Sequence, residues 1–393
     1  MLIGIDASRA FKKERTGIEE YSYQVIKHLT KYLGNSRVVL YVNPTLDLAE
    51  IDFGIPENWK VKKLKTPIFW TQFRLSWEMF FHPVNVLFIP AHNVPVIHPR
   101  NTTVTIHGLE YEFCPRAYSF FDRWYMRFSI KNSCKWARRI IAVSKNTKLD
   151  LVKLYKAPKE KIKVVYEGIG DKISKSEFLI SNQIPNPKSQ ISKLNTKYKI
   201  QDTKYILFIG RLEERKNICG IIEAFEILKE KYNLSHKLYL VGKFGYGWKK
   251  ISNKISNSKY KDDIISTGYI GENEKRELLR EADVFLFPTF YEGFGLPILE
   301  AQSAGAPVVT SNVSSMPEVV RLRQGFGGQA ADSAVLVNPK DSGEIARAVN
   351  KLISDKRLRN DIIEKGYENV ERFSWEKCAE EIAKMLIVAN NKD

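Results

Sequence analysis

The sequence has few of the residues that build metal centres, disulfide frameworks or redox sites. Its 393 residues include only four cysteines and six histidines, and neither set has metal-ligand spacing. No His-Glu-x-x-His motif and no Walker-type phosphate loop occurs. We therefore expect no bound metal, no resident cofactor, and thiols that stay reduced. The cysteines are Cys114, Cys134, Cys219 and Cys378.

Long apolar stretches are also absent. No segment reaches the roughly 18 uninterrupted apolar residues of a membrane span, although 44% of the residues are hydrophobic. The first residues, Met1–Asp6, predict a strand that leads into a charged loop, without the basic start and longer apolar run of a signal peptide. These features predict a cytoplasmic protein.

The glycine pattern of dinucleotide-dependent oxidoreductases is missing as well. Such enzymes carry Gly-x-Gly-x-x-Gly between the first strand and the first helix. Here that turn contains Gly17 alone, and the glycines of residues 242–247 follow a strand with a different spacing. The sequence therefore argues against an oxidoreductase of that class.

Apolar, β-prone runs alternate with helical patterns along nearly the whole chain. This alternation predicts an α/β fold made of doubly wound, Rossmann-like domains with parallel sheets. The expected strands are Leu2–Asp6, Val38–Val42, Val84–Phe88, Thr102–Ile106, Ile140–Val143, Lys163–Tyr166, Tyr205–Ile209, Lys237–Val241, Ile264–Thr267, Val284–Phe287 and Pro307–Thr310.

The length suits two domains better than one core. A polar stretch from about residue 168 to 204 separates the two halves. We place the first domain at residues 1–170 and the second at residues 171–373, because Ile191–Lys199 predicts a helix that belongs to the second domain.

A glycine-containing turn with two glutamates stands out in the second half, with the sequence YEGFGLPILE over Tyr291–Glu300. It follows a predicted buried strand, and Leu296–Ala304 predicts a helix whose first turn tolerates Pro297. The backbone N–H groups before this helix favour anions. We expect Glu292, on the loop, and Glu300, in the helix, to face one crevice.

Basic side chains follow the end of another predicted strand in the second half. The segment Gly210–Asn217 (GRLEERKN) follows the strand predicted at Tyr205–Ile209, and parallel strands share one carboxyl edge. Arg211 can bind phosphate through two N–H groups and Lys216 can act as a point charge. Taken alone, Tyr291–Glu300 is more often a surface turn with two solvated glutamates, and Arg211–Lys216 is equally compatible with a solvated loop that forms local ion pairs.

Together the two segments resemble the nucleotide-sugar site of the family-4 retaining glycosyltransferases, the glycosyl transferases group 1. The resemblance extends over most of the chain, and four further segments carry it less specifically. They are Ile3–Asp6 with Thr16–Tyr21, Thr105–Gly108, Ile141–Ser144 and Arg372–Trp375.

The resemblance implies the GT-B architecture, in which two Rossmann-like domains face each other across a cleft and the last helix, within residues 374–393, returns to the first domain. The donor nucleotide is then expected on the second domain and the acceptor on the first. Arg211 and Lys216 would neutralise the diphosphate as the glycosidic bond breaks. Glu300 would hold the ribose hydroxyls, and Glu292 would bind the donor sugar and support an oxocarbenium-like centre.

Smaller roles follow from the same resemblance. Gly17 would let the opposite domain approach closely, and His107 would contact the donor sugar or the acceptor. The family's frequent His-Asp pair is His107-Gly108 here, which puts acid–base work by an aspartate at that point in doubt. The expected catalytic residues are Arg211, Lys216, Glu292 and His107, and the expected donor-binding residues are Gly17, Gly293, Phe294, Gly295, Leu296 and Glu300.

The resulting hypothesis is a retaining, metal-independent glycosyltransferase that moves a sugar from a nucleotide-sugar substrate, with GDP-mannose as the expected donor, to a glycan or lipid-linked acceptor in cell-surface polysaccharide synthesis. Two alternatives stay open. A nucleotide-sugar epimerase of the same architecture is disfavoured because the combination of cations and paired glutamates belongs to the transferases. A non-catalytic glycan- or membrane-binding relative would be expected to lack Arg211, Lys216 or Glu300, and all three are present.

The formal charge of +17 is concentrated in the first half. Residues 1–170 hold 27 basic and 15 acidic side chains, a net +12, which leaves +5 for the rest. Arg116–Arg139 interleaves basic and aromatic residues, as helices at anionic membrane interfaces do. We expect a peripheral position on the inner face of the membrane; the alternative is that the aromatics face the core. No nucleic-acid-binding motif accompanies the charge, so nucleic acid is not an expected partner.

One segment departs from the family pattern. Family members commonly run from a Pro-Glu-Val turn almost directly into a short strand, whereas here Arg321–Ala330 separates Met316–Val320 from Ala334–Val337. We expect an added surface loop without a catalytic role; a lid over the donor is the contrary interpretation.

Overall fold

The computed structural model describes residues 1–12, 15, 17–46, 51–65, 70–170, 203–322 and 332–388. The chain divides into two compact units. The first comprises Met1–Glu112, Ser119–Gly170 and Phe373–Asp393, and the second comprises Phe113–Tyr118 and Asp171–Arg372.

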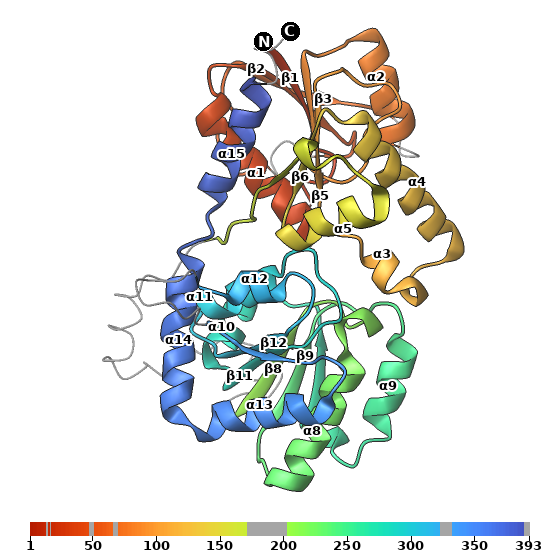
Figure 1. Ribbon diagram of the computed structural model, residues 1–393. Helices are drawn as coiled ribbons and strands as arrows, with labels where there is room; N and C mark the ends of the chain where they lie inside the picture. Colours follow the sequence, from red (N-terminus) through yellow and green to blue (C-terminus); the bar gives the residue numbers. More distant parts are fainter. Residues whose placement is uncertain are drawn as a thin grey trace. The chain divides into compact units, whose positions relative to one another are not determined.

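The first unit is built on a seven-stranded parallel sheet with the order β3-β2-β1-β4-β5-β6-β7 (Figure 1). Its central strands are continuous apolar runs, as expected where helices cover both faces of a sheet. β1 pairs with β2 and β4, so that Ile3 lies opposite Val38 and Val86. The strands are β1 (Leu2–Asp6), β2 (Arg37–Val42), β3 (Trp59–Lys63), β4 (Val86–Ile89), β5 (Thr102–Ile106), β6 (Arg139–Ala142) and β7 (Ile162–Val164).

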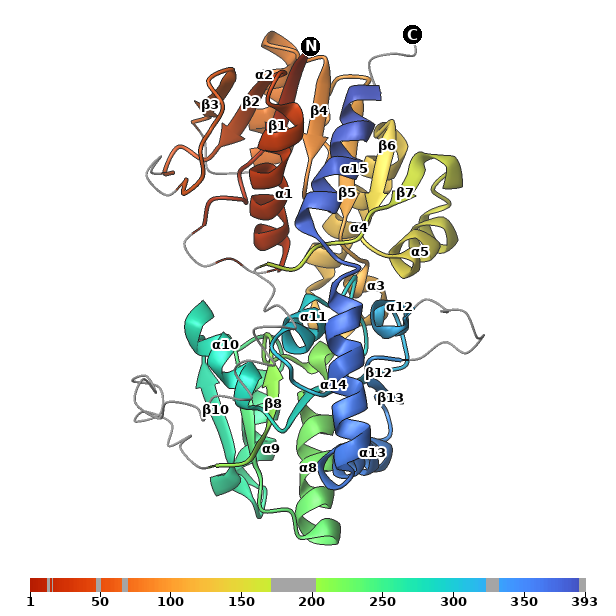
Figure 2. The same cartoon turned by 90° about the vertical axis from the view of Figure 1, so that its left-hand side faces the viewer.

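Helices cover both faces of this sheet (Figures 1 and 2). The last helix, α15 (Trp375–Val388), packs on α1 (Gly17–Leu33), where the Tyr21 and Trp375 rings are 5.9 Å apart. The remaining helices are η2 (Trp70–Leu75), α2 (Ser76–Phe81), α3 (Glu110–Phe113), α4 (Phe120–Trp136), α5 (Lys145–Tyr155) and η4 (Lys159–Lys161).

The second unit contains a six-stranded parallel sheet with the order β10-β9-β8-β11-β12-β13. β11 lies between β8 and β12, with Phe285 opposite Leu207 and Val308. The strands are β8 (Tyr205–Ile209), β9 (Lys237–Val241), β10 (Ile264–Gly268), β11 (Val284–Phe287), β12 (Val308–Ser311) and β13 (Val335–Val337).

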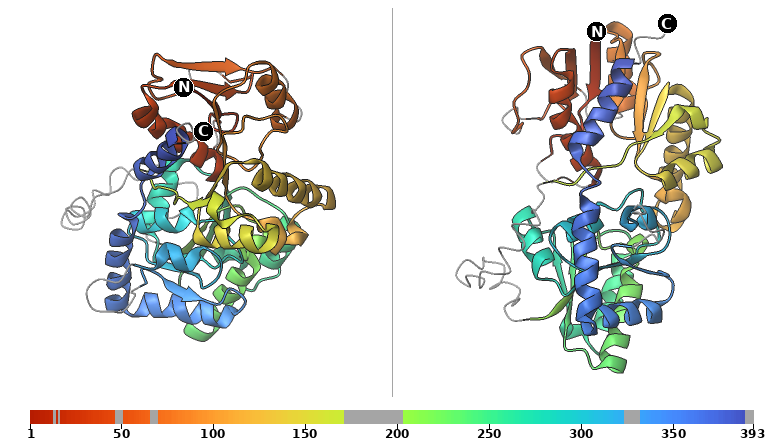
Figure 3. Two further views of the ribbon diagram at one scale, coloured as in Figure 1. Left: turned by 45° about the horizontal axis from the view of Figure 1, so that its top comes forward. Right: turned by 60° about the vertical axis from the view of Figure 1, so that its left-hand side comes forward.

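Helices also cover this sheet, as the two further views in Figure 3 show. Gln302 of α11 accepts a hydrogen bond from Asn369 of α14 at 2.8 Å, and Ser342 of α13 donates to Glu223 of α8 at 2.8 Å. The helices are η3 (Pro115–Ala117), η5 (Glu214–Lys216), α8 (Ile218–Tyr232), α9 (Trp248–Ser256), η6 (Lys261–Asp263), α10 (Glu272–Glu281), α11 (Leu296–Ser303), α12 (Met316–Val320), α13 (Ser342–Ser354) and α14 (Lys356–Val370).

The expected α/β class with parallel sheets is confirmed, and all eleven expected strands occur, with ends shifted by up to two residues. β3 and the short strand β13 were not among these eleven; the β3 sequence WKVKK carries three lysines and lies at the edge of the sheet, where it is exposed along part of its length. The helix expected at Ile191–Lys199 and most of the insertion at Arg321–Ala330 lie outside the described residues. Among the described helices, none combines the length and apolar character of a membrane span.

Candidate functional site

Two glycines bring the loops after β8 and β9 into close contact at the carboxyl edge of the second sheet. Gly210 has φ +155° and Gly242 has φ +136°. A Cβ atom on Gly242 would lie 2.0 Å from the Gly210 carbonyl oxygen, so only glycine fits there. The Leu212 amide then donates to the Lys243 carbonyl at 2.9 Å. This contact fixes the start of the loop that carries the basic residues.

Lys216 ends the short helix η5 and is buried with a relative exposure of 7%. Its Nζ forms an ion pair with Glu292 and lies 5.2 Å from the centre of the Phe287 ring. Burial and the neighbouring Arg215 cation lower the pKa of Lys216, against the opposing effect of Glu292. A buried lysine of this kind is positioned before any ligand arrives.

Arg215 links the two loops, and the sequence analysis did not identify it. Its guanidinium donates to Glu213 Oε1 at 2.7 and 3.1 Å, to the Tyr291 carbonyl at 3.0 Å and to Glu292 Oε1 at 3.2 Å. The ion-pair partners of Arg215 are Glu213 and Glu292, and that of Lys216 is Glu292, so two carboxylates and two cations form a charge-balanced network. The only sequence signal was a run of four charged residues, which does not say which of them faces inward.

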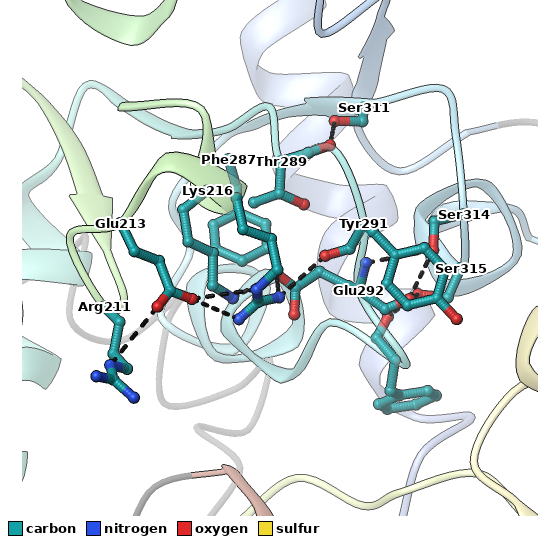
Figure 4. Close-up of polar contacts among 12 residues, drawn as sticks. Arg211, Glu213, Lys216, Phe287, Thr289, Tyr291, Glu292, Ser311, Ser314 and Ser315 are labelled. Carbon is teal, nitrogen blue, oxygen red and sulfur yellow. Dashed lines mark hydrogen bonds and ion pairs between the residues drawn. The ribbon is translucent and has the colours of Figure 1, made fainter. Parts of the chain in front are cut away.

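Arg211 has a different environment from Lys216. Its side chain is 59% exposed, and its Nε lies 3.7 Å from Glu213 Oε2 (Figure 4). Such a weak contact leaves the guanidinium able to reorient towards a ligand. The two expected phosphate-binding cations are therefore one fixed buried lysine and one accessible arginine.

Two serines after β12 hold the loop that carries Glu292. The Ser314 hydroxyl donates to the Glu292 carbonyl at 2.7 Å, and the Glu292 amide donates back to Ser314 Oγ at 3.2 Å. Ser315, which is fully buried, lies 2.7 Å from the Phe294 carbonyl and 2.9 Å from the Glu292 carbonyl (Figure 4). These serines were not predicted, because they follow a different strand from the residues they hold.

The loop then enters α11 as the sequence predicts. Gly295 precedes the helix with φ +116°, a left-handed conformation that suits glycine, and Pro297 lies in the first turn. The predicted residues Gly293, Phe294 and Leu296 lie at this helix N-terminus, where backbone N–H groups favour an anion.

Glu300 lies in α11 but contacts a cation that the sequence analysis did not identify. Lys275 of α10 places its Nζ 2.9 Å from Glu300 and 2.8 Å from Glu272. Burial opposes the charge on Lys275, but the two carboxylates outweigh it and raise the pKa of the lysine. Thus Glu292 and Glu300 follow one strand yet pair with cations from different elements.

The other two predicted residues, Gly17 and His107, belong to the first unit. A Cβ atom on Gly17 would meet no atom within 4 Å, so packing inside this unit does not require glycine at the start of α1. His107 is buried; its Nε2 lies 2.8 Å from the Pro90 carbonyl and its Nδ1 lies 3.2 Å from Glu167 Oε1. Both ring nitrogens therefore face protein acceptors.

The comparisons with known proteins agree with this fold. Residues 190–369 match the family described as Glycosyl transferases group 1, and residues 15–172 match Glycosyltransferase Family 4. The chain is 30% identical over 305 residues to the O-antigen chain mannosyltransferase B of Escherichia coli, covering 78% of this chain and 74% of that one. It is 29% identical over 291 residues to the capsular polysaccharide biosynthesis glycosyltransferase CapM of Staphylococcus aureus, covering 72% and 68%.

Solved structures show the same architecture. Anabaena HepE in complex with UDP-glucose superposes with a TM-score of 0.70 at 17% identity, over 98% of this chain and 99% of that chain. WaaG, a glycosyltransferase involved in lipopolysaccharide biosynthesis, gives a TM-score of 0.69 at 16% identity, also over 98% and 99%.

The two parallel-sheet units place the protein in the GT-B class of glycosyltransferase folds. The chain belongs to the group 1, family-4 glycosyltransferases.

Proposed function

We propose that this protein is a retaining glycosyltransferase that transfers a sugar from a nucleotide-sugar donor to a glycan or lipid-linked acceptor in surface polysaccharide synthesis. The observation that carries the proposal is the partly buried network in which Glu292 pairs with Arg215 and Lys216 beside the N-terminus of α11. Cations, a carboxylate and a helix N-terminus thus lie together at one edge of the sheet. The cations and the helix N-terminus suit a diphosphate, and the carboxylate suits sugar hydroxyls.

The cations act on the leaving group. Negative charge grows on the diphosphate as the glycosidic bond breaks, and pre-positioned cations stabilise that charge without reorganisation. Lys216 is already fixed by its ion pair and its contact with Phe287. Arg211 is exposed, so it can close onto the phosphates after the donor binds. Side-chain cations and the α11 N-terminus together provide this stabilisation without a metal ion.

The two glutamates have separate roles. Glu292 is held between Arg215 and Lys216, and its carboxylate oxygens can accept hydrogen bonds from sugar hydroxyls and support an oxocarbenium-like centre. Glu300 is 32% exposed at its side chain, so that its free oxygen can accept the hydroxyls of a ribose. Lys275 then sets the orientation of this carboxylate.

GDP-mannose is the donor we propose. Two of the curated relatives are named O-antigen chain mannosyltransferases, from Escherichia coli and Salmonella typhimurium, and the latter is 25% identical over 293 residues. The fold neighbour HepE binds UDP-glucose, which makes the uridine nucleotide the main competitor.

A thermal-shift panel of nucleoside diphosphates and nucleotide sugars tests the donor, because a ligand that binds only the folded protein stabilises it by mass action. We expect GDP and GDP-mannose to raise the unfolding temperature more than UDP and UDP-glucose, with or without a chelator. Stabilisation by UDP-glucose alone would indicate UDP-glucose, rather than GDP-mannose, as the donor. No stabilisation by any member, at concentrations that saturate a related enzyme, would contradict the site assignment.

A further inference from the structure

The loop after β4 holds a histidine in an unusual environment. The His92 amide donates to the Thr105 carbonyl of β5 at 2.9 Å, which fixes the residue at the carboxyl edge of the first sheet. Its φ is +53°, a left-handed conformation that is uncommon for residues other than glycine. The side chain is buried, with a relative exposure of 8%, and its Nδ1 has no hydrogen-bond partner among the described residues. Buried polar atoms without a partner destabilise a fold, and strained residues cluster at functional sites.

His92 differs in this respect from its neighbour His107. The two rings pack edge to face, with their centres 5.3 Å apart. The nitrogens of His107 face the Pro90 carbonyl and Glu167, so its hydrogen-bonding capacity is used within the protein. Burial, the nearby His107 and the Arg9 cation lower the pKa of His92, so its ring is neutral near pH 7. A neutral imidazole offers one N–H donor and one acceptor nitrogen to a ligand.

A glutamine on a neighbouring helix shows the same feature. Gln72 lies in η2, a π-helical turn, and such turns occur frequently at functional sites. Its Nε2 donates to the Val94 carbonyl at 3.2 Å, which ties η2 to the loop that carries His92. Its Oε1 is buried and has no hydrogen-bond partner in the part of the chain that the structure describes. Two buried polar groups on two segments in contact thus lack partners, which points to a polar ligand.

Charged and aromatic groups lie at the same edge of the first sheet. β1 and β4 are neighbouring parallel strands, so the chain leaves them side by side, at Asp6 and shortly before His92 (Figure 2). Asp6 Oδ1 accepts a hydrogen bond from Trp70 Nε1 of η2 at 3.2 Å. Burial raises the pKa of Asp6, against the opposing effects of its hydrogen bonds and of Arg9. The half-exposed Arg9 therefore acts on both Asp6 and His92.

The chemistry of this set suits a sugar. Its carboxylate and guanidinium cancel in charge and the imidazole is neutral, so the set fits uncharged hydroxyl groups better than a phosphate. Carboxylate, amide and imidazole groups accept hydrogen bonds from hydroxyls, and a guanidinium donates to them. An indole combines an apolar body with a polar tip, which matches the C–H faces and hydroxyls of a sugar ring.

We propose that these side chains bind the hydroxyl groups of the acceptor sugar: Asp6, Arg9, Trp70, Gln72 and His92. The sugar hydroxyls provide the hydrogen-bond partners that His92 Nδ1 and Gln72 Oε1 lack among the described residues. The inference rests on the proposed transferase function, because it assigns residues to the second substrate of that reaction. It makes His92, rather than His107, the histidine that contacts the acceptor.

Binding of simple glycosides to the full-length protein tests the inference. The probes are the methyl glycosides of mannose, glucose, galactose and N-acetylglucosamine, titrated by ligand-observed NMR. We expect at least one of them to bind the wild type. His92→Ala should weaken that binding about tenfold or more, because it removes a buried hydrogen-bonding group. His92→Asn should stay within a few fold of the wild type, because asparagine tolerates a left-handed φ and places an amide atom where Nδ1 lies.

A second variant avoids the risk that a buried substitution unfolds the protein. The Arg9 side chain is 50% exposed and lies 3.9 Å from Glu19, so Arg9→Met should fold normally. It should weaken glycoside binding about tenfold, since a hydrogen bond from a charged donor is lost. Circular dichroism confirms that each variant is folded.

His28 of α1 provides the matched control, because its Nδ1 already lies 2.8 Å from the Gln24 carbonyl. His28→Ala should bind the glycosides as the wild type does. Equal weakening by His28→Ala and His92→Ala would overturn the inference, and so would unchanged glycoside affinity in both His92→Ala and Arg9→Met. Absence of binding of all four glycosides to the wild type would also overturn it.

Thermal shift with the nucleotide-sugar panel measures the proposed function separately. We expect the donor to stabilise the wild type and His92→Ala equally, because the donor is proposed to bind the second unit. No stabilisation of the wild type by any nucleotide sugar would contradict the transferase function itself. Normal stabilisation by the donor, together with wild-type glycoside affinity in His92→Ala, would overturn only the acceptor site.

Discussion

At the scale of single residues, the environments of Arg211 and Lys216 predict different consequences of removing each charge. Arg211 is exposed, so Arg211→Ala should lower kcat by a factor that corresponds to about 2.7–4 kcal/mol with little effect on folding. Lys216→Ala should lower kcat similarly and also destabilise the fold by about 3–5 kcal/mol, because it breaks a buried pair.

Steady-state kinetics and thermal unfolding measure the two effects. Lys259→Ala is the control, since Lys259 is 81% exposed and pairs only with Glu230 among the described residues. Wild-type turnover and donor affinity in both Arg211→Ala and Lys216→Ala would overturn the assignment of these residues to the diphosphate.

Glu300 should behave as a binding residue rather than a catalytic one. It is proposed to hold a ribose that does not change during the reaction, so Glu300→Gln should raise KM for the donor and leave kcat nearly unchanged. Lys275→Met should raise KM as well, because it releases the Glu300 carboxylate from a 2.9 Å contact. A fall in kcat at constant KM in either variant would place the residue near the reacting centre instead.

Lys275 should also give the fold a specific pH dependence. Its pKa is raised in the folded protein above the ordinary value of 10.5, so its stabilising effect is complete below that pH and is lost as the pH rises through the folded value. The stability advantage of the wild type over Lys275→Met should thus be constant near neutrality and shrink in strongly alkaline buffer. Chemical unfolding of both proteins across this range measures it; an advantage that grows with pH would contradict the ion-pair assignment.

At the scale of elements, the insertion between α12 and β13 offers a test of function. Its ends are held together, because Arg321 and Asp332 form an antiparallel bridge and an ion pair of 3.3 Å. Replacing residues 323–330 by a short Gly-Ser linker should therefore leave the fold intact, since loop-closure entropy depends weakly on length. We expect turnover within a few fold of the wild type, measured at saturating donor. Loss of activity in a folded protein would identify the insertion as a lid.

At the scale of the whole molecule, the chain crosses from the second unit back to the first near Phe373. α15 buries Trp375 and Leu386 in the first unit, where the Trp375 ring contacts Tyr21. Truncation after Arg372 should therefore destabilise the first unit by several kcal/mol, because each large apolar side chain contributes about 1.5–3 kcal/mol.

Thermal unfolding in the presence of the donor distinguishes the two units, since the donor is proposed to stabilise only the second. The truncated chain should show an early transition that the donor does not shift and a later one that it does. A single, donor-shifted transition at the wild-type temperature would contradict both the stabilisation of the first unit by α15 and the restriction of the donor's effect to the second unit.

The sequence by itself determined the features that depend on local patterns. Apolar runs such as Tyr205–Ile209 specify buried parallel strands, because their side chains leave no polar face. Gly295 and Pro297 specify the start of α11 through their backbone preferences, and a chain segment that follows a strand necessarily reaches the edge of the sheet. These signals located both site loops and the family to which they belong.

Only the tertiary structure decided which charges meet. Arg215 and Lys275 were missed because pairing with Glu292 and Glu300 depends on neighbouring strands and helices, which no spacing along the chain encodes. The exposed orientation of Trp124 likewise follows from the small buried face of α4 and its hydrogen bonds to residues 93–94, rather than from the composition of the helix. Local propensity fixes the elements, whereas contacts between distant residues fix which faces and charges remain accessible.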